Sequence, residues 1–585
     1  MDQYQAQWSE MIAAAIDAEA GERGIDPAAR ADLAFETPPS ADLGDLAVPM
    51  FPFAKLLRTS PAAIASAVAA RLASTAGASD GTAVAAGPYV NIRLPRADVA
   101  ASAVPRVLAE GDVYGRNALY DGTRITIEFS SPNTNKPLHL GHLRNDALGE
   151  SLSRVLAACG ATVRSVNLVN DRGIHICKSM LAYQEFGAGE TPESSGVKGD
   201  RLVGDYYVKF NEWAKQTPDA EARARQLLVA WEAGDPDVVA LWKKMNDWVL
   251  AGISQTYEAT GIHFDAVYFE SETYSSGKDE IARGIEAGVF YREDDGSVWV
   301  DLEPIGLDRK ILLRADGTSV YLTQDIGTVI ARYNDSPFDR MIYVVGSEQI
   351  YHFRVLFYVL ELLGYEWAGN LFHLAYGMVN LPEGKMKSRE GTVVDADDLI
   401  AELTELAAAE IRAKERESAV ENVDETAHKI AIGALHYYLL QVGANKDMIF
   451  NPRESLSFTG NTGPYLQYMC ARVNSMIRKA ADRRIELDSH IDFNVLDMAE
   501  EWELVKLVAR YPATVEAAGR DYAPGLLAGY LYDVAKAFSQ YYHDVPIITA
   551  PSTSVRTARL ALSRAVLQVL RNGLDLLNIP YLDAM

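Results

Sequence analysis

Two histidines stand three residues apart in the segment SSPNTNKPLHLGHLRND, and an asparagine and a lysine precede them. His139 and His142 can donate N–H groups to an anion or bind a metal ion, Lys136 adds a positive charge, and Asn133 adds an amide. Three kinds of site are open: a metal site, a phosphate site, or imidazoles that only hydrogen-bond the backbone. A zinc site is disfavoured because the segment lacks the glutamate and the i,i+4 spacing of the zinc-protease pattern, and no third ligand lies nearby.

The elements around the histidines favour phosphate. Residues 124–130 predict a strand, the segment from 143 to 160 predicts a helix that ends at its glycine, and a second strand follows from 162. Such a βαβ unit predicts a parallel sheet with a ligand crevice at the carboxyl ends of its strands. The histidines then fall at a helix start, where free amides and the helix dipole attract anions. Gly141 leaves room for an adenine or a ribose.

Other nucleotide motifs do not compete with this interpretation. The chain contains no GxGxxG, and GMVNLPEGKM has neither the glycine spacing nor the Ser/Thr of a P-loop. A second cationic segment, KMKSREG, carries Lys385, Lys387 and Arg389 between two glycines. Alone it is typical of a solvated turn. Together with the histidines it predicts a mobile clamp for a departing pyrophosphate.

Composition limits the classes of protein that this chain can be. At 585 residues it predicts three or more domains. Neither a membrane-spanning apolar run nor a signal peptide is found, and the first residues predict an amphipathic helix. Three scattered cysteines argue against a disulfide framework and a structural zinc site, so we expect a cytoplasmic protein. The formal charge of −25 disfavours nucleic acid for the whole chain, but a locally basic surface can still bind a polyanion.

The pattern along the chain predicts four regions. Residues 1–110 form a small mixed domain, and 111–400 form the parallel-sheet domain with a helical insertion at about 180–260. A helical connector at 401–454 and a helical bundle at 455–585 complete the chain, which has no internal repeat.

Within these regions several elements can be placed. We expect strands at Gly87–Pro95, Met341–Ser347 and Leu371–Val379, and a small-residue loop at 73–87. The region beyond about residue 400 is expected to be almost wholly helical.

These motifs resemble those of a known family. HLGH and KMKSREG resemble the two signatures of the class I aminoacyl-tRNA synthetases. The order of further motifs along nearly the whole chain resembles the arginyl-tRNA synthetase family. These motifs are EFSSPNTNKPLHLGHLRN, LVNDRGIH, KGDRLVGDYYVKF, VYLTQDIG, VVGSEQIYHF, GNTGPYLQYMCARV and LNIPYLDAM.

The resemblance implies an α/β fold: a Rossmann-type parallel-sheet catalytic domain with an inserted subdomain, an α+β N-terminal accessory domain and an all-α C-terminal anticodon-binding bundle. It implies ATP-dependent ligation of L-arginine to its tRNA through an arginyl-adenylate, with release of pyrophosphate and AMP. The expected partners are tRNA, arginine and ATP with Mg²⁺. No tightly bound metal, organic cofactor or membrane is expected, and we expect a monomer.

The resemblance also assigns roles near the ATP. His139, Gly141, His142, Met386 and Ser388 are implied to bind ATP. The implied catalytic residues are His139, His142, Lys136, Lys385, Lys387 and Arg389.

One position departs from the common class I order, Lys-Met-Ser-Lys-Ser. Here the order is Lys-Met-Lys-Ser-Arg, so Ser388 replaces the second lysine of the signature. Some arginyl enzymes share this departure and carry a lysine upstream of the histidines. We therefore expect Lys136 to take over part of the missing phosphate contact.

The amino-acid pocket can be derived from the chemistry of arginine. A planar guanidinium needs carboxylates in bidentate reach and often an aromatic neighbour. Tyr321 and Asp325 have i,i+4 spacing, and Glu270 offers a further carboxylate. Taken alone, Asp325 is typical of a helix cap and Glu270 of a surface charge. The full set that the resemblance implies is Glu128, Asn133, Glu270, Tyr321, Asp325 and Gln349.

The tRNA contacts are expected in the C-terminal bundle. One predicted helix gathers Arg472, Arg478 and Lys479, and the later segment YLYDVAKAFSQYYHDVP gathers tyrosines. Basic side chains and aromatic faces are used to bind single-stranded RNA, but most of these tyrosines can equally pack the bundle. The N-terminal domain resembles the one that arginyl enzymes place against the outer corner of tRNA.

Three alternatives differ from this interpretation. A cysteinyl synthetase would need a zinc-bound thiolate pocket, which the scattered cysteines disfavour. Small nucleotidyltransferases share the histidine motif but lack the long helical C-terminal region. A catalytically silent RNA-binding paralogue is disfavoured by the intact His139, His142, Lys385 and Asp325.

Overall fold

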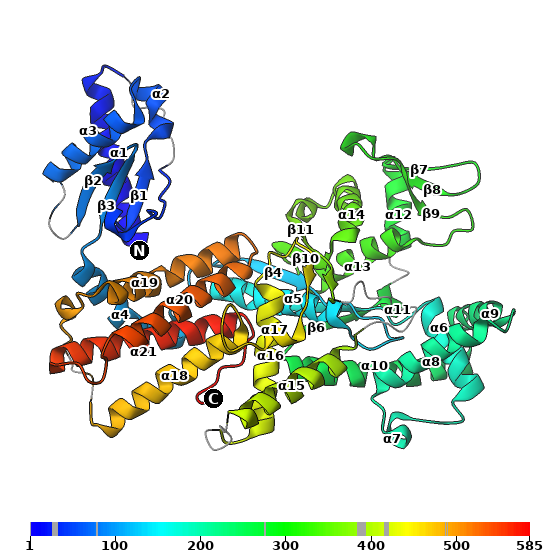
Figure 1. Cartoon of the computed structure of the whole chain (residues 1–585). Coiled ribbons are helices and arrows are strands. Elements are labelled where there is room, and N and C mark those ends of the chain that lie inside the picture. The colour runs from blue at the N-terminus through cyan, green and yellow to red at the C-terminus, as the bar shows by residue number, and fades with distance from the viewer. Residues whose placement is uncertain are drawn as a thin grey trace. The chain divides into compact units, whose positions relative to one another are not determined.

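The computed structural model describes residues 2–25, 33–75, 77, 80–273, 277–382, 394–414, 420–485, 487 and 490–585 (Figure 1). The chain divides into two compact units that interleave in sequence. The first comprises residues 1–115, 472–514 and 533–572, and the second, here called the catalytic unit, comprises 116–471, 515–532 and 573–585. None of the described helices is long and apolar enough to cross a membrane.

A parallel five-stranded sheet forms the centre of the catalytic unit, in the order β11-β10-β4-β5-β6. Its strands are β4 (Arg124–Glu128), β5 (Thr162–Val169), β6 (Ala266–Phe269), β10 (Arg340–Gly346) and β11 (Leu371–Tyr376). Strands β4 and β10 are buried along nearly their whole length, as expected for a parallel sheet that is covered on both faces. Strand β4 is therefore the middle strand of the sheet and lies between β10 and β5.

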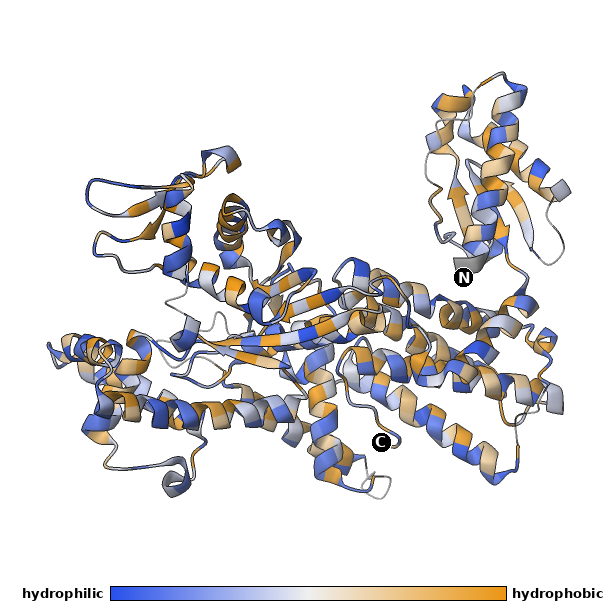
Figure 2. Cartoon of the chain, turned by 180° about the vertical axis from the view of Figure 1, so that it is seen from behind, coloured by the Kyte–Doolittle hydropathy of each residue, from blue (hydrophilic) through white to orange (hydrophobic). Residues whose placement is uncertain are grey.

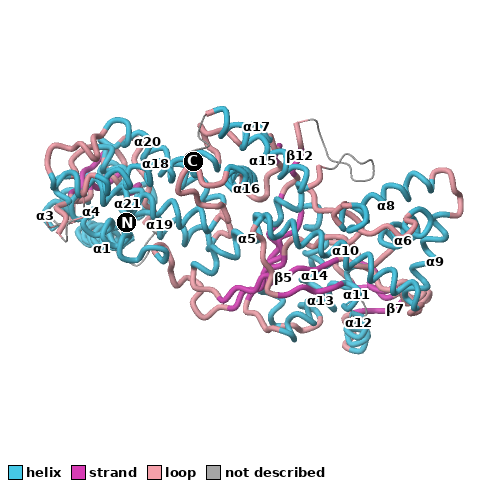
Figure 3. Tube along the Cα trace, turned by 90° about the horizontal axis from the view of Figure 1, so that it is seen from below, coloured by secondary structure: helices cyan, strands magenta, loops and turns pink. Residues whose placement is uncertain are grey.

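Helices cover both faces of this sheet. Figure 3 shows α5 (Leu140–Ala158) on one side of the strands and α13 (Tyr321–Asp335) and α14 (Ile350–Leu362) on the other. Helix α5 is buried along most of its length because it also packs against α16 (Val423–Leu440). Figure 2 shows hydrophobic residues along the central strands and mixed colours on the helices.

The predicted insertion follows β5 and is helical. Its members are α6 (Ile174–Phe186), α7 (Pro192–Ser195), α8 (Gly199–Ala214), α9 (Ala220–Glu232) and α10 (Pro236–Thr260). Helix α8 packs against both α6 and α10.

A smaller antiparallel sheet lies between β6 and β10 in sequence. It consists of β7 (Phe290–Arg292), β8 (Val298–Val300) and β9 (Lys310–Leu313), with α11 (Glu270–Thr273) and α12 (Gly277–Glu286) before it. The sequence reasoning did not anticipate this sheet. Its strands are too short for a clear period-2 pattern, and their apolar residues face one local core with α13 and α14.

The described chain beyond about residue 400 is mostly helical, as predicted. It contains α15 (Ala396–Ala413), α16, α17 (Pro452–Ser455), α18 (Gly463–Asp482), α19 (Ala499–Arg520), α20 (Gly525–Asp544) and α21 (Thr553–Leu576). The two-residue strand β13 (Met448–Ile449) lies among these helices and pairs in parallel with β12 (Val379–Asn380), which follows β11.

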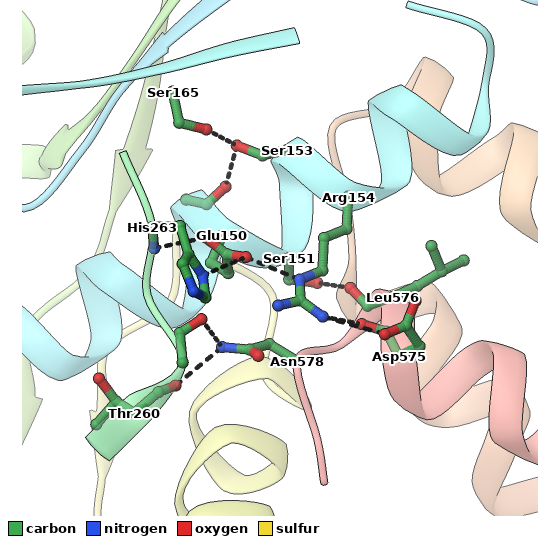
Figure 4. A network of polar contacts seen from close by, with 12 residues as sticks. Glu150, Ser151, Ser153, Arg154, Ser165, Thr260, His263, Asp575, Leu576 and Asn578 are labelled. Atoms are coloured by element: carbon green, nitrogen blue, oxygen red, sulfur yellow. Dashed lines mark hydrogen bonds and ion pairs between the residues drawn. The ribbon is translucent and has the colours of Figure 1, made fainter. Parts of the chain in front are cut away.

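The C-terminal residues are anchored on the catalytic unit (Figure 4). Ser151 of α5 donates to the carbonyl of Leu576 at 2.9 Å, and Arg154 donates to the carbonyl of Asp575 at 3.0 Å. The amide of Asn578 donates to the carbonyls of Thr260 and Gly261, at the end of α10. The end of the chain thus ties α5 to α10.

The first unit begins with a small α+β domain. Its elements are α1 (Asp2–Glu22), β1 (Leu46–Pro49), α2 (Ala54–Leu57), α3 (Pro61–Thr75), β2 (Thr82–Ala86), β3 (Tyr89–Arg93) and α4 (Arg96–Glu110). The prediction of a loop through 73–87 was wrong at Thr82–Ala86, which pairs antiparallel with β3. A strand of alanine and threonine has too little contrast in hydrophobicity to be recognised by its alternation.

Candidate active site

Several candidate residues follow the carboxyl ends of parallel strands. Glu128 ends β4, Asp171 follows β5, Glu270 follows β6 and Gln349 follows β10. Parallel strands bring these ends to one edge of the sheet, where α/β folds bind ligands. The sheet order therefore brings together residues that are as far apart in sequence as 128 and 349.

The two histidines form the N-terminal cap of α5. His139 is the cap residue, and its Nδ1 accepts from the backbone N–H of Gly141 at 3.1 Å. The Nδ1 of His142 accepts from the backbone N–H of His139 at 3.2 Å, and the ring centroids are 4.0 Å apart. Because both Nδ1 atoms are acceptors, each neutral ring carries its proton on Nε2. Each histidine thus keeps one N–H donor for a ligand.

Both histidines are neutral in the folded protein at physiological pH. Burial, together with the charge of the neighbouring Lys136, lowers the pKa of His139 to about 3. Burial and the charges of His139 and Lys136 hold the pKa of His142 well below its usual value. These imidazoles therefore act as hydrogen-bond donors, and the positive charge in this segment belongs to the lysine.

Lys136 lies half-buried in the wall of a cavity of about 500 Å³. Burial lowers its pKa, and among the described residues no hydrogen-bond or ion-pair partner of its ammonium is found. The cavity is also lined by Asn133, Asn135, Pro137, Leu138, His139, His175, Arg201, Gly204, Asp205, Tyr207, Val208, Asp395 and Asp398. An unpaired, half-buried cation in such a place favours an anionic ligand.

The start of α15 forms another wall of this cavity. The backbone N–H of Ala396 donates to the carbonyl of Leu138 at 2.9 Å, and His139 and Asp395 form an isolated antiparallel bridge. Lys198 of the insertion contacts Asp397 at 2.5 Å. The segment before α15 is thus tied to the histidine segment. The predicted residues Lys385, Met386, Lys387, Ser388 and Arg389 lie outside the described residues.

Tyr321 and Asp325 lie on the first turns of α13, where their i,i+4 spacing puts both on one face of the helix. Tyr321 is 78% exposed, so its ring is available to a ligand. The carboxylate of Asp325 accepts from Nε2 of His352, which lies on the first turn of α14, at 2.6 Å. Sequence reasoning missed His352, although it stands three residues after the predicted Gln349 and therefore in the same helix start.

Glu270 is a partly buried acid with an altered titration. Its pKa is raised to about 7, mainly by burial and also by the charges of Asp171 and Asp325, which outweigh the opposing effect of Arg172. Arg172 is itself paired with Glu232 at 2.6 Å. Among the described residues named around Glu270, negative side chains therefore outnumber positive ones. This excess of negative charge favours a positively charged ligand.

Glu128 occupies a different position from the other acids. It is buried and forms an ion pair with Arg332, which is also buried. Its second oxygen lies 3.5 Å from the hydroxyl of Ser131. The structure therefore places Glu128 behind the ligand edge, where it supports the turn that leads to Asn133.

Asn133 and Gln349 occupy the rim of this edge. Asn133 pairs with Asn170 in an isolated parallel bridge and lines the cavity, and Gln349 is exposed at the start of α14. Both amides are available to a polar ligand.

The basic residues predicted for tRNA lie on α18, in the first unit. Arg478 and Lys479 are exposed, and Lys479 lines a hollow of about 460 Å³ with Tyr542. The guanidinium of Arg472 lies 5.3 Å from the centroid of the Tyr542 ring. Tyr541 is buried, which agrees with a packing role for part of the tyrosine segment.

The described residues contain no group of three or more His, Cys, Asp or Glu side chains that could hold a metal ion. The cysteines Cys159, Cys177 and Cys470 are free and buried.

Family models match most of the chain. Residues 103–452 match the tRNA synthetases class I (R), catalytic domain. Residues 6–94 match the arginyl tRNA synthetase N terminal domain, and 466–585 match the DALR anticodon binding domain.

Similar proteins are found by sequence and by structure. The arginine–tRNA ligase of Treponema denticola is 54% identical and covers 100% of both chains. That of Borreliella burgdorferi is 45% identical over 95% of each chain. The arginyl-tRNA synthetase of Thermus thermophilus superposes with a TM-score of 0.83 at 26% identity, covering 99% of this chain and 100% of that one.

Proposed function

This chain belongs to the class I arginyl-tRNA synthetase family, and on that premise we propose how its residues divide the work of the reaction. The enzyme ligates arginine to tRNA with consumption of ATP. The arginine carboxylate attacks the α-phosphorus, a bond to pyrophosphate breaks, and an arginyl-adenylate forms. A hydroxyl of the terminal adenosine of the tRNA then attacks the carbonyl carbon, and AMP leaves.

We assign the ATP phosphates to the cavity beside α5. The observation that carries this assignment is the half-buried ammonium of Lys136, which has no partner among the described residues and lies near the histidines His139 and His142. These groups stabilise charge that develops on the transferring phosphoryl group. ATP is expected as its Mg²⁺ complex. Lys385, Lys387 and Arg389 remain proposed partners of the leaving pyrophosphate.

We assign arginine to the acidic edge formed by Asp325 and Glu270. Their carboxylates face the guanidinium, and the exposed ring of Tyr321 covers one of its faces. Asn133 and Gln349 hold the α-amino and carboxylate groups. Holding this carboxylate still beside the phosphates is the main contribution of the protein, because the carboxylate is already a nucleophile at neutral pH.

The remaining regions are proposed to bind tRNA. The helices from about residue 455 take the anticodon, with Arg472, Arg478 and Lys479 facing its phosphates, and residues 1–110 contact the rest of the tRNA. We propose the division 111–400 for the catalytic domain and 401–454 for the connector. We further propose that the enzyme is a cytoplasmic monomer.

The test is ATP–pyrophosphate exchange with each of the twenty amino acids, with and without bulk bacterial tRNA. Exchange is expected with arginine alone and is expected to depend on added tRNA. Exchange with another amino acid would overturn the roles of Tyr321, Asp325 and Glu270. A lack of exchange under both conditions would contradict the activity itself.

The pocket assignment has a separate test. Asp325→Asn keeps the shape of the side chain and removes its charge, so the arginine KM should rise about 10-fold or more while the ATP KM stays within a factor of about two. An unchanged arginine KM would remove Asp325 from the pocket.

A further inference from the structure

The imidazole of His352 makes the one side-chain contact found for Asp325 among the described residues. Nε2 of His352 lies 2.6 Å from Oδ2 of Asp325, and the two side chains come from the starts of different helices, α14 and α13. The exposed fractions of the two side chains are 23% for His352 and 34% for Asp325. Both side chains are therefore partly exposed, so that solvent or a ligand can reach the carboxylate.

Asp325 needs such a partner because its surroundings are acidic. Its charge raises the pKa of Glu128 and of Glu270, so both carboxylates lie close to it. Arg332 is already paired with Glu128, and Arg172 with Glu232. Since Glu128 is neutralised by Arg332, the like-charged neighbour of Asp325 is Glu270, and the hydrogen bond from His352 holds the Asp325 carboxylate in place beside it.

We propose that His352 is a positioning residue for the substrate arginine. It holds Asp325 through Oδ2 and leaves Oδ1 turned to the guanidinium, an inference that rests on the proposed arginine pocket. The guanidinium is a planar fork, so its binding depends on the plane of the carboxylate as well as on its charge. A carboxylate that can rotate freely binds the fork less well.

The role of His352 requires only its N–H group. The side-chain amide of glutamine places an N–H donor near the position of Nε2, whereas phenylalanine keeps a ring and removes the donor. The two substitutions separate hydrogen bonding from packing.

The experiment compares His352→Phe with His352→Gln in pyrophosphate exchange, with tRNA present. His352→Phe should raise the arginine KM about 10- to 100-fold, the usual range for losing a hydrogen bond to a charged group, and leave the ATP KM within about twofold. His352→Gln should recover most of this loss. KM is insensitive to the fraction of molecules that fold, so partial misfolding does not obscure the result.

His373→Phe is the matched control. The ring of His373 lies 4.4 Å from that of Phe353, which follows His352 in the chain, and its Nε2 donates to the carbonyl of Val345 at 3.0 Å. It has no contact with Asp325. The arginine KM of this control should stay near that of the wild type, even if its thermal unfolding midpoint falls. An equal rise in the arginine KM for both phenylalanine variants would overturn the proposal.

Two further variants, Asp325→Asn and the double variant Asp325→Asn/His352→Phe, test the arginine pocket and the positioning role of His352 separately. If His352 acts through Asp325, His352→Phe changes the arginine KM by less than about threefold in the Asp325→Asn background. The same effect in both backgrounds would overturn the role of His352 and leave the pocket intact. If Asp325→Asn itself leaves the arginine KM unchanged, the proposed pocket is wrong, and the positioning role falls with it.

Discussion

The Nδ1 atom of His142 accepts a hydrogen bond from the backbone N–H of His139, so the second histidine of the motif holds the first in place. His139 in turn caps the helix through the N–H of Gly141. This reciprocal capping satisfies amides that would otherwise lack partners at the helix start. It also leaves the Nε2–H group of each ring free of the cap.

A comparison of His142→Asn with His142→Gln tests whether the two nitrogens of His142 have separate roles, Nδ1 in the cap and Nε2–H in catalysis. Asparagine offers an acceptor near the position of Nδ1 and so keeps the cap, but it has no donor at the position of Nε2. We expect His142→Asn to unfold near the wild-type temperature and to lose about 10- to 100-fold in the rate of arginine activation. His142→Gln should unfold earlier, because losing a cap costs about 1 kcal/mol, and keep more activity. Full activity of His142→Asn in pyrophosphate exchange would contradict a role for Nε2–H.

Lys136→Met tests the proposed phosphate contact, because methionine keeps most of the apolar stem and removes the charge. We expect the rate of arginine activation to fall about 10-fold or more, since a half-buried cation next to the phosphates has been removed. Lys209→Met is the control: it removes an exposed lysine from α8 of the same unit and should leave exchange unchanged. A wild-type rate for Lys136→Met would refute the hypothesis that Lys136 takes over the phosphate contact of the second signature lysine, which is Ser388 in this chain.

The arginine KM should depend on pH through Glu270. Its pKa of about 7 lies above the usual value, and a bound guanidinium favours the ionised form. As the pH falls through 7, Glu270 takes up a proton and binding weakens, so the KM should rise roughly fivefold between pH 7 and pH 6.

Glu270→Gln is the control for this pH dependence. Its arginine KM should be high and nearly flat over the same interval. A wild-type KM that stays constant from pH 8 to pH 6 would exclude Glu270 from the pocket.

Asn578→Asp should destabilise the catalytic unit. The side-chain amide of Asn578 donates to two backbone carbonyls (Figure 4). Separately, the backbone carbonyl of Asn578 accepts from Nδ1 of the buried His436 at 2.6 Å. A carboxylate would face the two carbonyls without a proton to donate, at a cost of about 1–3 kcal/mol. The thermal unfolding midpoint reports this loss.

Two further variants are compared with Asn578→Asp in thermal unfolding. Asn578 has a left-handed backbone with φ of 53°, which glycine also adopts, so Asn578→Gly removes the amide without strain and should be less harmful than aspartate. Asp575→Asn removes a largely exposed partner of Arg154 and should shift the midpoint little. Equal stability of Asn578→Asp and the wild type would contradict an anchoring role for this residue.

Local patterns predicted much of the fold because they depend on short-range physics. The run from 124 to 128 has the continuous apolar character of a buried parallel strand, and β4 forms there. Tyr321 and Asp325 have the i,i+4 spacing of one helix face, and α13 begins at Tyr321. The strand at Thr82–Ala86 was missed because alanine and threonine show little contrast between the two faces of a strand.

The partners of the site residues could not be predicted in this way. Nothing near Asp325 in sequence indicates His352, and nothing near Glu128 indicates Arg332. Each pair joins elements that come into contact only when the sheet and its covering helices have assembled. The contact of Lys198 with Asp397 joins residues of the insertion to residues close to the start of α15 for the same reason.

The sequence by itself determined the chemistry of this protein: the two histidines and the lysine before them, the acids that suit a guanidinium, and the strand–helix–strand order that puts both sets at one edge of a sheet. Side-chain type, spacing and periodicity are local properties, and they can be read along the chain. Only the tertiary structure decided which acid stays available to a ligand and which is neutralised. Glu128 is paired with Arg332, whereas Glu270 remains partly buried with a raised pKa. Burial and ion pairing depend on every element that packs around a group, and that packing is a property of the whole fold.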